Sequence, residues 1–147
     1  MKLSTKTRYA TRALAELAVA WPDGVMATRE IAEKQNISFK YLEQIMAPLR
    51  NAGIVESHQG KGGGFSLARP PEDITLEEVY RAFEGSPAPV QCLEEGGGCS
   101  LQRVCPSRET WEEIRERILD VLRNTTLRDL EERLRERTGS SPPMYHI

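Results

Sequence analysis

All three cysteines of this 147-residue chain lie in one glycine-rich stretch, CLEEGGGCSLQRVC, as Cys92, Cys99 and Cys105. Three thiols cannot all pair as disulfides, but three thiolates can supply most of the ligands of a zinc ion or an iron–sulfur cluster. The spacing Cys-x6-Cys-x5-Cys is wider than that of an ordinary zinc knuckle, which disfavours zinc. Direct oxidation of metal-free thiols, or three unreactive thiols, are the other interpretations of this loop.

The composition is that of an ordinary globular protein, with 39% hydrophobic and 29% charged residues. No apolar run approaches the ~20 residues that a membrane span needs, so we expect a cytoplasmic protein with no membrane association. Thiols stay reduced in that compartment. With only two histidines, the chain offers no Ser/His/Asp or Cys/His arrangement, and we do not expect an enzyme.

The net charge of −2 conceals an asymmetry along the chain. Residues 1–70 carry 10 Lys/Arg against 6 Asp/Glu, a net charge of +4. Residues 71–147 carry 10 against 16, a net charge of −6. A basic N-terminal half predicts a polyanionic partner for that half, with scattered solvated charge as the alternative.

The elements expected in the basic half are three helices and a hairpin. Apolar residues at helical spacing predict helices over residues 5–20, 29–35 and 39–51. Ser4, Thr28 and Ser38 are their expected N-caps. The runs IVESHQ and FSLAR flank GKGGG, which predicts a β-hairpin. Helices in this order followed by a hairpin indicate a winged helix-turn-helix, a DNA-binding arrangement.

Polar residues lie where such a fold would meet DNA. Ser38, Lys40, Tyr41 and Gln44 fall at the N-terminal end of the third helix, mostly off its apolar stripe. An amide side chain there can pair with adenine, and a lysine can reach guanine or the backbone. Lys61 stands at the hairpin tip between glycines. The expected phosphate contacts are Thr28, Arg29 and Arg50.

The acidic half contains further helices. Thr75 and Glu78 form a capping box before a short helix that extends to Phe83. Ser107 is the expected cap of a long helix, whose apolar residues at 3–4 spacing predict a two-helix seam. We expect a DNA-binding domain over 1–84, a sensor loop over 85–106, dimerisation and C-terminal helices over 107–137, and a flexible tail over 138–147. The seam residues are Trp111, Ile114, Ile118, Val121 and Leu122.

The stretches MKLSTKTRYATRALAELA, YLEQI and GKGGGFSLAR, followed by the three cysteines, resemble the Rrf-two family of bacterial winged-helix regulators. The resemblance extends from about Met1 to Leu134 and is strongest to members of the IscR type, with the NsrR and CymR types as further relatives. It implies a mainly α fold with a small β-hairpin wing and a long C-terminal dimerisation helix. It also implies a homodimeric transcription factor, usually a repressor, that binds a near-palindromic double-stranded DNA operator.

The same resemblance implies a 2Fe–2S cluster on Cys92, Cys99 and Cys105. The signal would then be iron–sulfur, redox or nitric-oxide status. The alternative is a metal-free or thiol-based regulator of the CymR type, which acts through a metabolic-enzyme partner.

The fourth cluster ligand departs from the family pattern. Arg108 stands where IscR-type members have histidine, and Arg8 stands where NsrR-type members have an acidic residue. Arginine stays protonated and cannot ligate a metal. Glu109, one residue further along, is the nearest substitute. The other possibilities are a small external ligand or the residues Glu94, Glu95, His58 and His146.

The DNA surface departs from the family pattern as well. Gln59 occupies the place before the glycine run where IscR-type members often have an arginine, and Lys40 replaces a small polar residue. Glu43 matches a family glutamate that discriminates between operators, and its carboxylate could accept a hydrogen bond from cytosine N4. These changes prevent any transfer of an operator sequence from relatives.

Overall fold

The computed structural model describes residues 2–139 and confirms the fold expected from the sequence, a mainly helical chain with one two-stranded hairpin. The predicted tail over 138–147 lies almost wholly outside the described residues, as does His146. The elements are α1 (Thr5–Ala20), α2 (Thr28–Gln35), α3 (Phe39–Asn51), β1 (Val55–His58), β2 (Gly64–Leu67), η1 (Pro71–Asp73), α4 (Leu76–Glu84), η2 (Gln91–Leu93), α5 (Arg108–Asn124) and α6 (Leu127–Thr138).

Side-chain caps fix the starts of α1 and α3. Ser4 Oγ accepts a hydrogen bond from the Thr7 amide, and Ser38 Oγ accepts one from the Tyr41 amide, as the sequence predicted. The turn between α2 and α3 depends on Asn36, whose φ of 54° places it in the left-handed region that asparagine tolerates. The helix-turn-helix therefore follows from a few local signals.

The wing is an antiparallel hairpin in which Val55 pairs with Leu67 and His58 with Gly64. A second backbone contact anchors it, because Met26 and Phe65 exchange two N–H···O bonds of 2.9 Å. A Cβ atom on Gly64 would lie 1.9 Å from the Met26 carbonyl oxygen. At least this glycine of the predicted DNA-contacting turn is needed for the fold itself.

One apolar core joins these elements. The apolar stripe predicted for α3 is fully buried and packs against side chains of α1, α2, the wing and α4; its residues are Leu42, Ile45, Met46 and Leu49. Burial of such side chains is the main stabilising term of a domain of this size. The largest fully buried side chains include Leu14, Leu17, Ile31, Leu42, Ile45, Leu49, Ile54 and Ile74.

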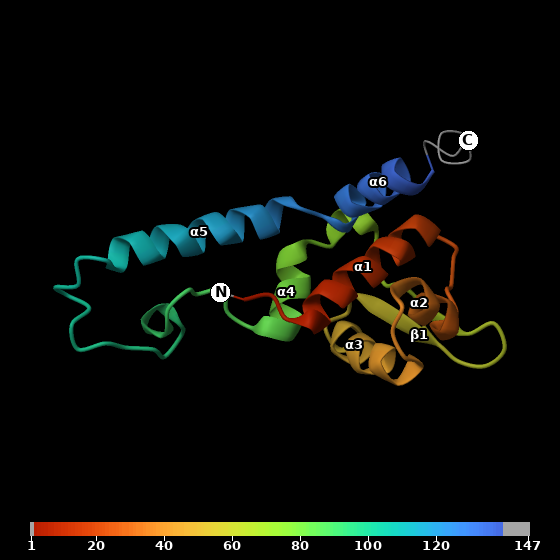
Figure 1. Cartoon of the computed structure of the whole chain (residues 1–147), viewed down its shortest axis with the longest axis horizontal. Coiled ribbons are helices and arrows are strands. Elements are labelled where there is room, and N and C mark those ends of the chain that lie inside the picture. Colours follow the sequence, from red (N-terminus) through yellow and green to blue (C-terminus); the bar gives the residue numbers. More distant parts are fainter. Residues whose placement is uncertain (1, 140–147) are drawn as a thin grey trace.

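Beyond α4 the chain leaves this body and returns to it (Figure 1). Residues 85–107 form an extended excursion that includes η2, and α5 runs back from it as a long arm. Helix α6 then lies along α1. Backbone bonds of 2.9 Å, from Leu76 N to Thr125 O and from Leu127 N to Ile74 O, hold the return point beside α4.

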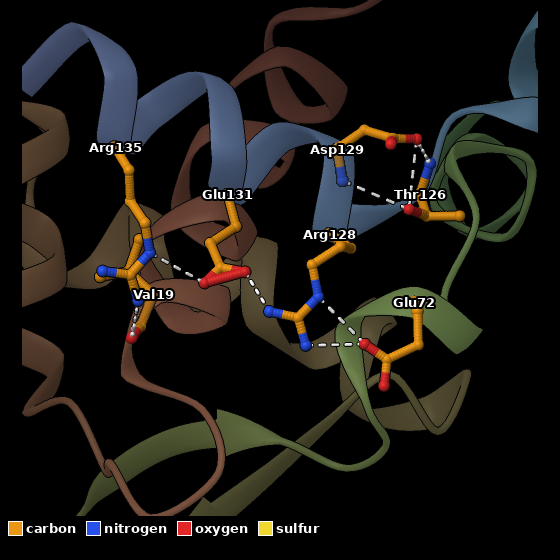
Figure 2. A network of polar contacts seen from close by, with 7 residues as sticks. All are labelled: Val19, Glu72, Thr126, Arg128, Asp129, Glu131 and Arg135. Atoms are coloured by element: carbon orange, nitrogen blue, oxygen red, sulfur yellow. Dashed lines mark hydrogen bonds and ion pairs between the residues drawn. The ribbon is translucent and has the colours of Figure 1, made fainter.

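Ion pairs lock α6 onto the body (Figure 2). Glu131, only 5% exposed, accepts hydrogen bonds from both Arg128 and Arg135. Arg128 also reaches Glu72 with Nε at 3.0 Å and Nη2 at 2.7 Å, and this contact lowers the pKa of Glu72. Arg135 donates to the Val19 carbonyl at 3.2 Å. A buried carboxylate that is paired on both sides fixes the register of α6.

The expected cap of α2 is wrong, and the expected cap of α5 is confirmed in position but not in its side-chain bond. Helix α2 begins at Thr28 itself, with Ala27 as its N-cap and no side-chain hydrogen bond there. The bridge between Met26 and Phe65 sets the chain direction just before the helix, so its start is fixed by the wing. Ser107 is the N-cap residue of α5, as expected, but its side chain makes no capping hydrogen bond, and its Oγ lies 3.3 Å from Cys105 Sγ instead. The capping box of Thr75 and Glu78 is confirmed.

Candidate nucleic-acid interface

A groove of about 670 Å³ separates the wing from the start of α2 and the outer face of α3. Residues from all three elements line it, including Phe39, His58 and the backbone of the wing glycines. Half of the residues predicted to bind DNA come together in this groove. They are Thr28, Arg29, Glu43, Arg50 and Gln59.

The first turn of α3 carries the remaining predicted residues of that helix. Lys40 and Gln44 are exposed, so their amine and amide are free to reach a ligand. The Ser38 hydroxyl already caps the helix. The Tyr41 ring is half-buried and packs edge-on against Tyr9, with ring centroids 6.0 Å apart. Tyr41 therefore positions α3 against α1 and offers only part of its surface to a partner.

The wing presents Lys61 at its exposed tip. The Gln59 amide donates to Ser57 Oγ at 3.4 Å, which directs this side chain along the outside of β1. His58 Nε2 lies 2.7 Å from Ser66 Oγ across the hairpin. The lysine is thus the one predicted wing residue whose polar atoms have no partner within residues 2–139.

Charge around the groove is predominantly positive. Arg29, Lys40, Arg50 and Lys61 are exposed, and none forms an ion pair within the described part of the chain. Glu43 supplies the single opposing carboxylate among the predicted residues. Unpaired cations beside a helix and a wing are suited to phosphates on either side of a base-reading element.

Phe39 is a groove residue that sequence reasoning missed. It is 51% exposed at the first position of α3 and lines the groove. An exposed aromatic ring there can make apolar contact with a thymine methyl group. The missed signal is its place before the buried stripe that begins at Leu42, which leaves Phe39 without a core partner.

The cysteine loop has a different character. Cys99 is exposed and its Sγ accepts a hydrogen bond from Leu101 N at 3.4 Å, while Cys92 and Cys105 are half-buried. The hydroxyl of Ser107 lies against Cys105 Sγ and lowers the pKa of that thiol, with the Arg108 backbone and charge adding to the effect. A lowered pKa increases the thiolate fraction, which is the reactive and metal-binding form.

The three thiols do not converge in this structure. No group of three or more His, Cys, Asp or Glu side chains within residues 2–139 is placed to hold a metal ion. Glu109 is exposed on the first turn of α5, and Arg108 pairs instead with Glu112 at 3.1 Å. The residues as arranged do not fit a preformed 2Fe–2S site.

Helix α5 leaves an apolar surface uncovered. Val121 is 65% exposed and Ile114 is 38% exposed, while Leu119 is the one buried residue of the helix. Leu101 and Val104 of the cysteine loop are also exposed. Apolar side chains at seam spacing on a projecting helix are typical of a surface that a second helix covers.

Residues 3–133 match the Rrf2 family, described as iron-dependent transcriptional regulators. The chain belongs to this family. Protein rrf2 of Nitratidesulfovibrio vulgaris is 40% identical over 130 residues, which cover 88% of this chain and 87% of that protein. CymR of Bacillus subtilis is 41% identical over 130 residues, covering 88% and 89%. Members of the family are transcriptional regulators rather than enzymes, and CymR is of the helix-turn-helix type.

Solved structures agree with this assignment. The structure of CymR, the global cysteine regulator of B. subtilis, superposes with a TM-score of 0.77 and 39% identity, covering 90% of this chain and 98% of CymR. IscR of T. potens gives a TM-score of 0.74 at 33% identity, covering 99% and 96%. The Rrf2-family resemblance and the winged-helix fold are confirmed. None of the helices in residues 2–139 has the length and apolar character that a bilayer crossing demands.

Proposed function

We propose that this regulator reads a DNA operator with α3 and the wing, and that the cysteine loop controls its affinity. The observation that carries the proposal is the set of unpaired cations around the groove between α2, α3 and the wing. Gln44 on α3 reads base edges, whereas Arg29, Lys40, Arg50 and Lys61 neutralise phosphates. Glu43 lines the same groove and discriminates among bases by accepting a hydrogen bond from cytosine N4.

The active unit is proposed to be a homodimer formed through α5. Its exposed apolar residues, Ile114 and Val121 among them, would be covered by the same helix of a second copy. Two recognition helices would then address half-sites about one helical turn, ~34 Å, apart. Because α5 begins at the end of the cysteine loop, a change in that loop alters how the two DNA-binding bodies are spaced.

Two signals are proposed for the loop. The first is a 2Fe–2S cluster on Cys92, Cys99 and Cys105, which requires the loop to rearrange because its thiols do not converge. The second is thiol oxidation without metal, in the manner of a CymR-type regulator. The depressed pKa of Cys105 and the likeness to the global cysteine regulator support the second signal.

DNA reading is tested with Gln44→Ala and Lys61→Ala in a mobility-shift assay on a duplex selected from a random library. Gln44→Ala is expected to lower affinity for the selected duplex while leaving binding to unrelated DNA unchanged. Lys61→Ala is expected to weaken both by a similar factor, since a phosphate contact carries no sequence information. If neither variant changes specific binding, this surface is misassigned.

The two signals are separated by iron and acid-labile sulfide analysis after anaerobic reconstitution, with an absorption spectrum. Near-equal iron and sulfide with visible absorbance supports the cluster, and Glu109→Ala then tests the proposed fourth ligand. Colourless protein without iron supports the thiol signal. In that case Cys105→Ser should abolish any response of DNA affinity to a mild oxidant, whereas unchanged sensitivity would contradict it.

A further inference from the structure

A second cavity, of about 730 Å³, lies between α1, the C-terminal end of α2 and α6. Its lining includes Arg12, Lys34, Gln35, Arg133 and Arg137. None of the ten residues predicted to bind DNA lines it, so it is separate from the groove beside the wing. Its volume falls in the range of small-molecule sites.

The cavity carries a strong excess of positive charge. Its lining contains four cationic side chains, those of Arg12, Lys34, Arg133 and Arg137, and one carboxylate, that of Glu16. Glu16 already lies 3.4 Å from the Lys34 amine. Three cations therefore remain without a neutralising carboxylate in the lining, which is the electrostatic condition for an anion site.

The unpaired arginines lie on the cavity side of α6. Arg133 and Arg137 are exposed, one helical turn apart, and neither makes a hydrogen bond or ion pair within residues 2–139. Like charges at this spacing disfavour a helix. On the same helix, Arg128 and Arg135 both pair with Glu131, and Arg128 pairs with Glu72 as well, so two carboxylates balance these two arginines (Figure 2). Within residues 2–139, the α6 arginines that face the body are therefore paired with carboxylates, whereas the two that line the cavity, Arg133 and Arg137, are not.

The guanidinium of Arg12 is oriented by contacts with Gln35 and Tyr9. Its Nε donates to the Gln35 side-chain oxygen at 2.8 Å, and its guanidinium lies 4.6 Å from the centre of the Tyr9 ring. Gln35 is 6% exposed, so this partner is itself fixed. A pre-oriented guanidinium loses little freedom when it binds an anion.

The lining is not purely ionic, because Ala15, Leu130 and Leu134 contribute aliphatic surface between the cations. A bare inorganic ion would leave that surface unused. An organic molecule with charged ends would bury it and engage arginines on both sides. We propose that this cavity binds a small organic anion with at least two negative charges, a phosphate ester or a dicarboxylate.

Such a ligand would act on DNA binding through contacts already present. Arg12 donates a hydrogen bond to Gln35, the last residue of α2. The next residue is Asn36, whose left-handed conformation makes the turn of the helix-turn-helix. Tyr9 packs edge-on against Tyr41 in the first turn of α3. A ligand that binds Arg12 would therefore shift the conformation of this turn, and with it the orientation of the recognition helix α3. This coupling rests on the proposed function, whereas the binding site does not.

The site is tested by calorimetric titration of the full chain without DNA, at constant ionic strength. The probes are glycerol 3-phosphate, glutarate and inorganic phosphate. We expect saturable binding of at least one organic probe at one molecule per chain, weakened at least tenfold in the double variant Arg133→Gln/Arg137→Gln. The matched control is Arg117→Gln, another exposed arginine of the acidic half, on α5, which should bind as the parent does. Since the double variant relieves repulsion, it should unfold at no lower temperature than the parent.

No saturable binding of any probe, or equal affinity in the double variant, would overturn the proposal. Inorganic phosphate binding as tightly as both organic probes would overturn the organic assignment. A second arm repeats the mobility-shift assay with saturating probe, where we expect at least a threefold change in DNA affinity that the double variant lacks. Unchanged affinity would refute the coupling alone, and failure to bind DNA with intact probe binding would refute the proposed function alone.

Discussion

Replacement of Lys61 by alanine should change the salt dependence of DNA binding by a predictable amount. Each protomer presents four exposed, unpaired cations beside the groove, Arg29, Lys40, Arg50 and Lys61, so a dimer presents eight. Each neutralised phosphate contributes about −0.9 to the slope of log K against log salt concentration, which gives a slope of about −7. The Lys61→Ala dimer retains six cations and should show a slope of about −5.

The difference is large enough to measure. Between 50 and 200 mM salt, affinity should fall by roughly 10⁴-fold for the parent and roughly 10³-fold for the variant. Fluorescence anisotropy of a labelled duplex over a salt series gives both slopes. Arg117→Gln is the control, because it removes an exposed positive charge from α5, away from the groove, and should leave the slope unchanged. Equal slopes for the parent and Lys61→Ala would refute the placement of the wing on DNA.

Three further predictions concern the elements that position the interface. Leu127→Ala removes a fully buried side chain at the start of α6 and should lower the free energy of unfolding in urea by about 2–5 kcal/mol. Glu84 accepts hydrogen bonds from Ser4 N and Thr7 Oγ1, and these bonds lower the pKa of its carboxyl group. The ionised carboxylate therefore stabilises the folded state fully above the ordinary carboxyl pKa, and this stabilisation is lost as the pH falls through the lowered pKa. Below about pH 5 the parent should therefore lose unfolding free energy more steeply than Glu84→Gln, whereas parallel curves would exclude this contact as the cause. Val121→Glu places a charge on the exposed seam of α5 and should give folded monomers in sedimentation velocity, whereas persistent dimers would place the interface elsewhere.

Local signals in the sequence were sufficient for most of the body. The caps Ser4 and Ser38, the Thr75 capping box and the glycine-rich hairpin each depend on residues within a few positions of one another, and each is confirmed. The apolar stripes of α1 and α3 likewise identify their buried faces. Periodicity and capping are short-range properties, so they can be read from a single chain.

Long-range contacts account for what the sequence could not reveal. The start of α2 depends on the bridge between Met26 and Phe65, almost forty positions apart, which no local pattern encodes. The packing of α6 on α1 depends on Glu131 and its two arginines. In the sequence these three residues look like ordinary charges on the solvent-exposed face of a helix. The exposed Phe39 and the cavity at Arg12 became visible only once three elements were packed together.

The cysteine loop shows a different limit. The sequence predicts a ligand set from residue type and spacing alone, yet spacing does not determine where three side chains point in a loop of glycines. Arg108 and Arg8 occupy the places of the expected fourth ligand, and the described loop holds Cys99 and Cys105 in separate local contacts. The site residues for DNA and cluster binding therefore remain predictions.

In the proposed function, two copies joined through α5 read DNA with α3 and the wing. Selection of bound duplexes from a random library, followed by sequencing and footprinting of the enriched duplex, tests it most directly. We expect a near-palindromic sequence with two half-sites whose centres lie about one helical turn, ~34 Å, apart, both protected together. A library without enrichment, or a single isolated half-site, would contradict it.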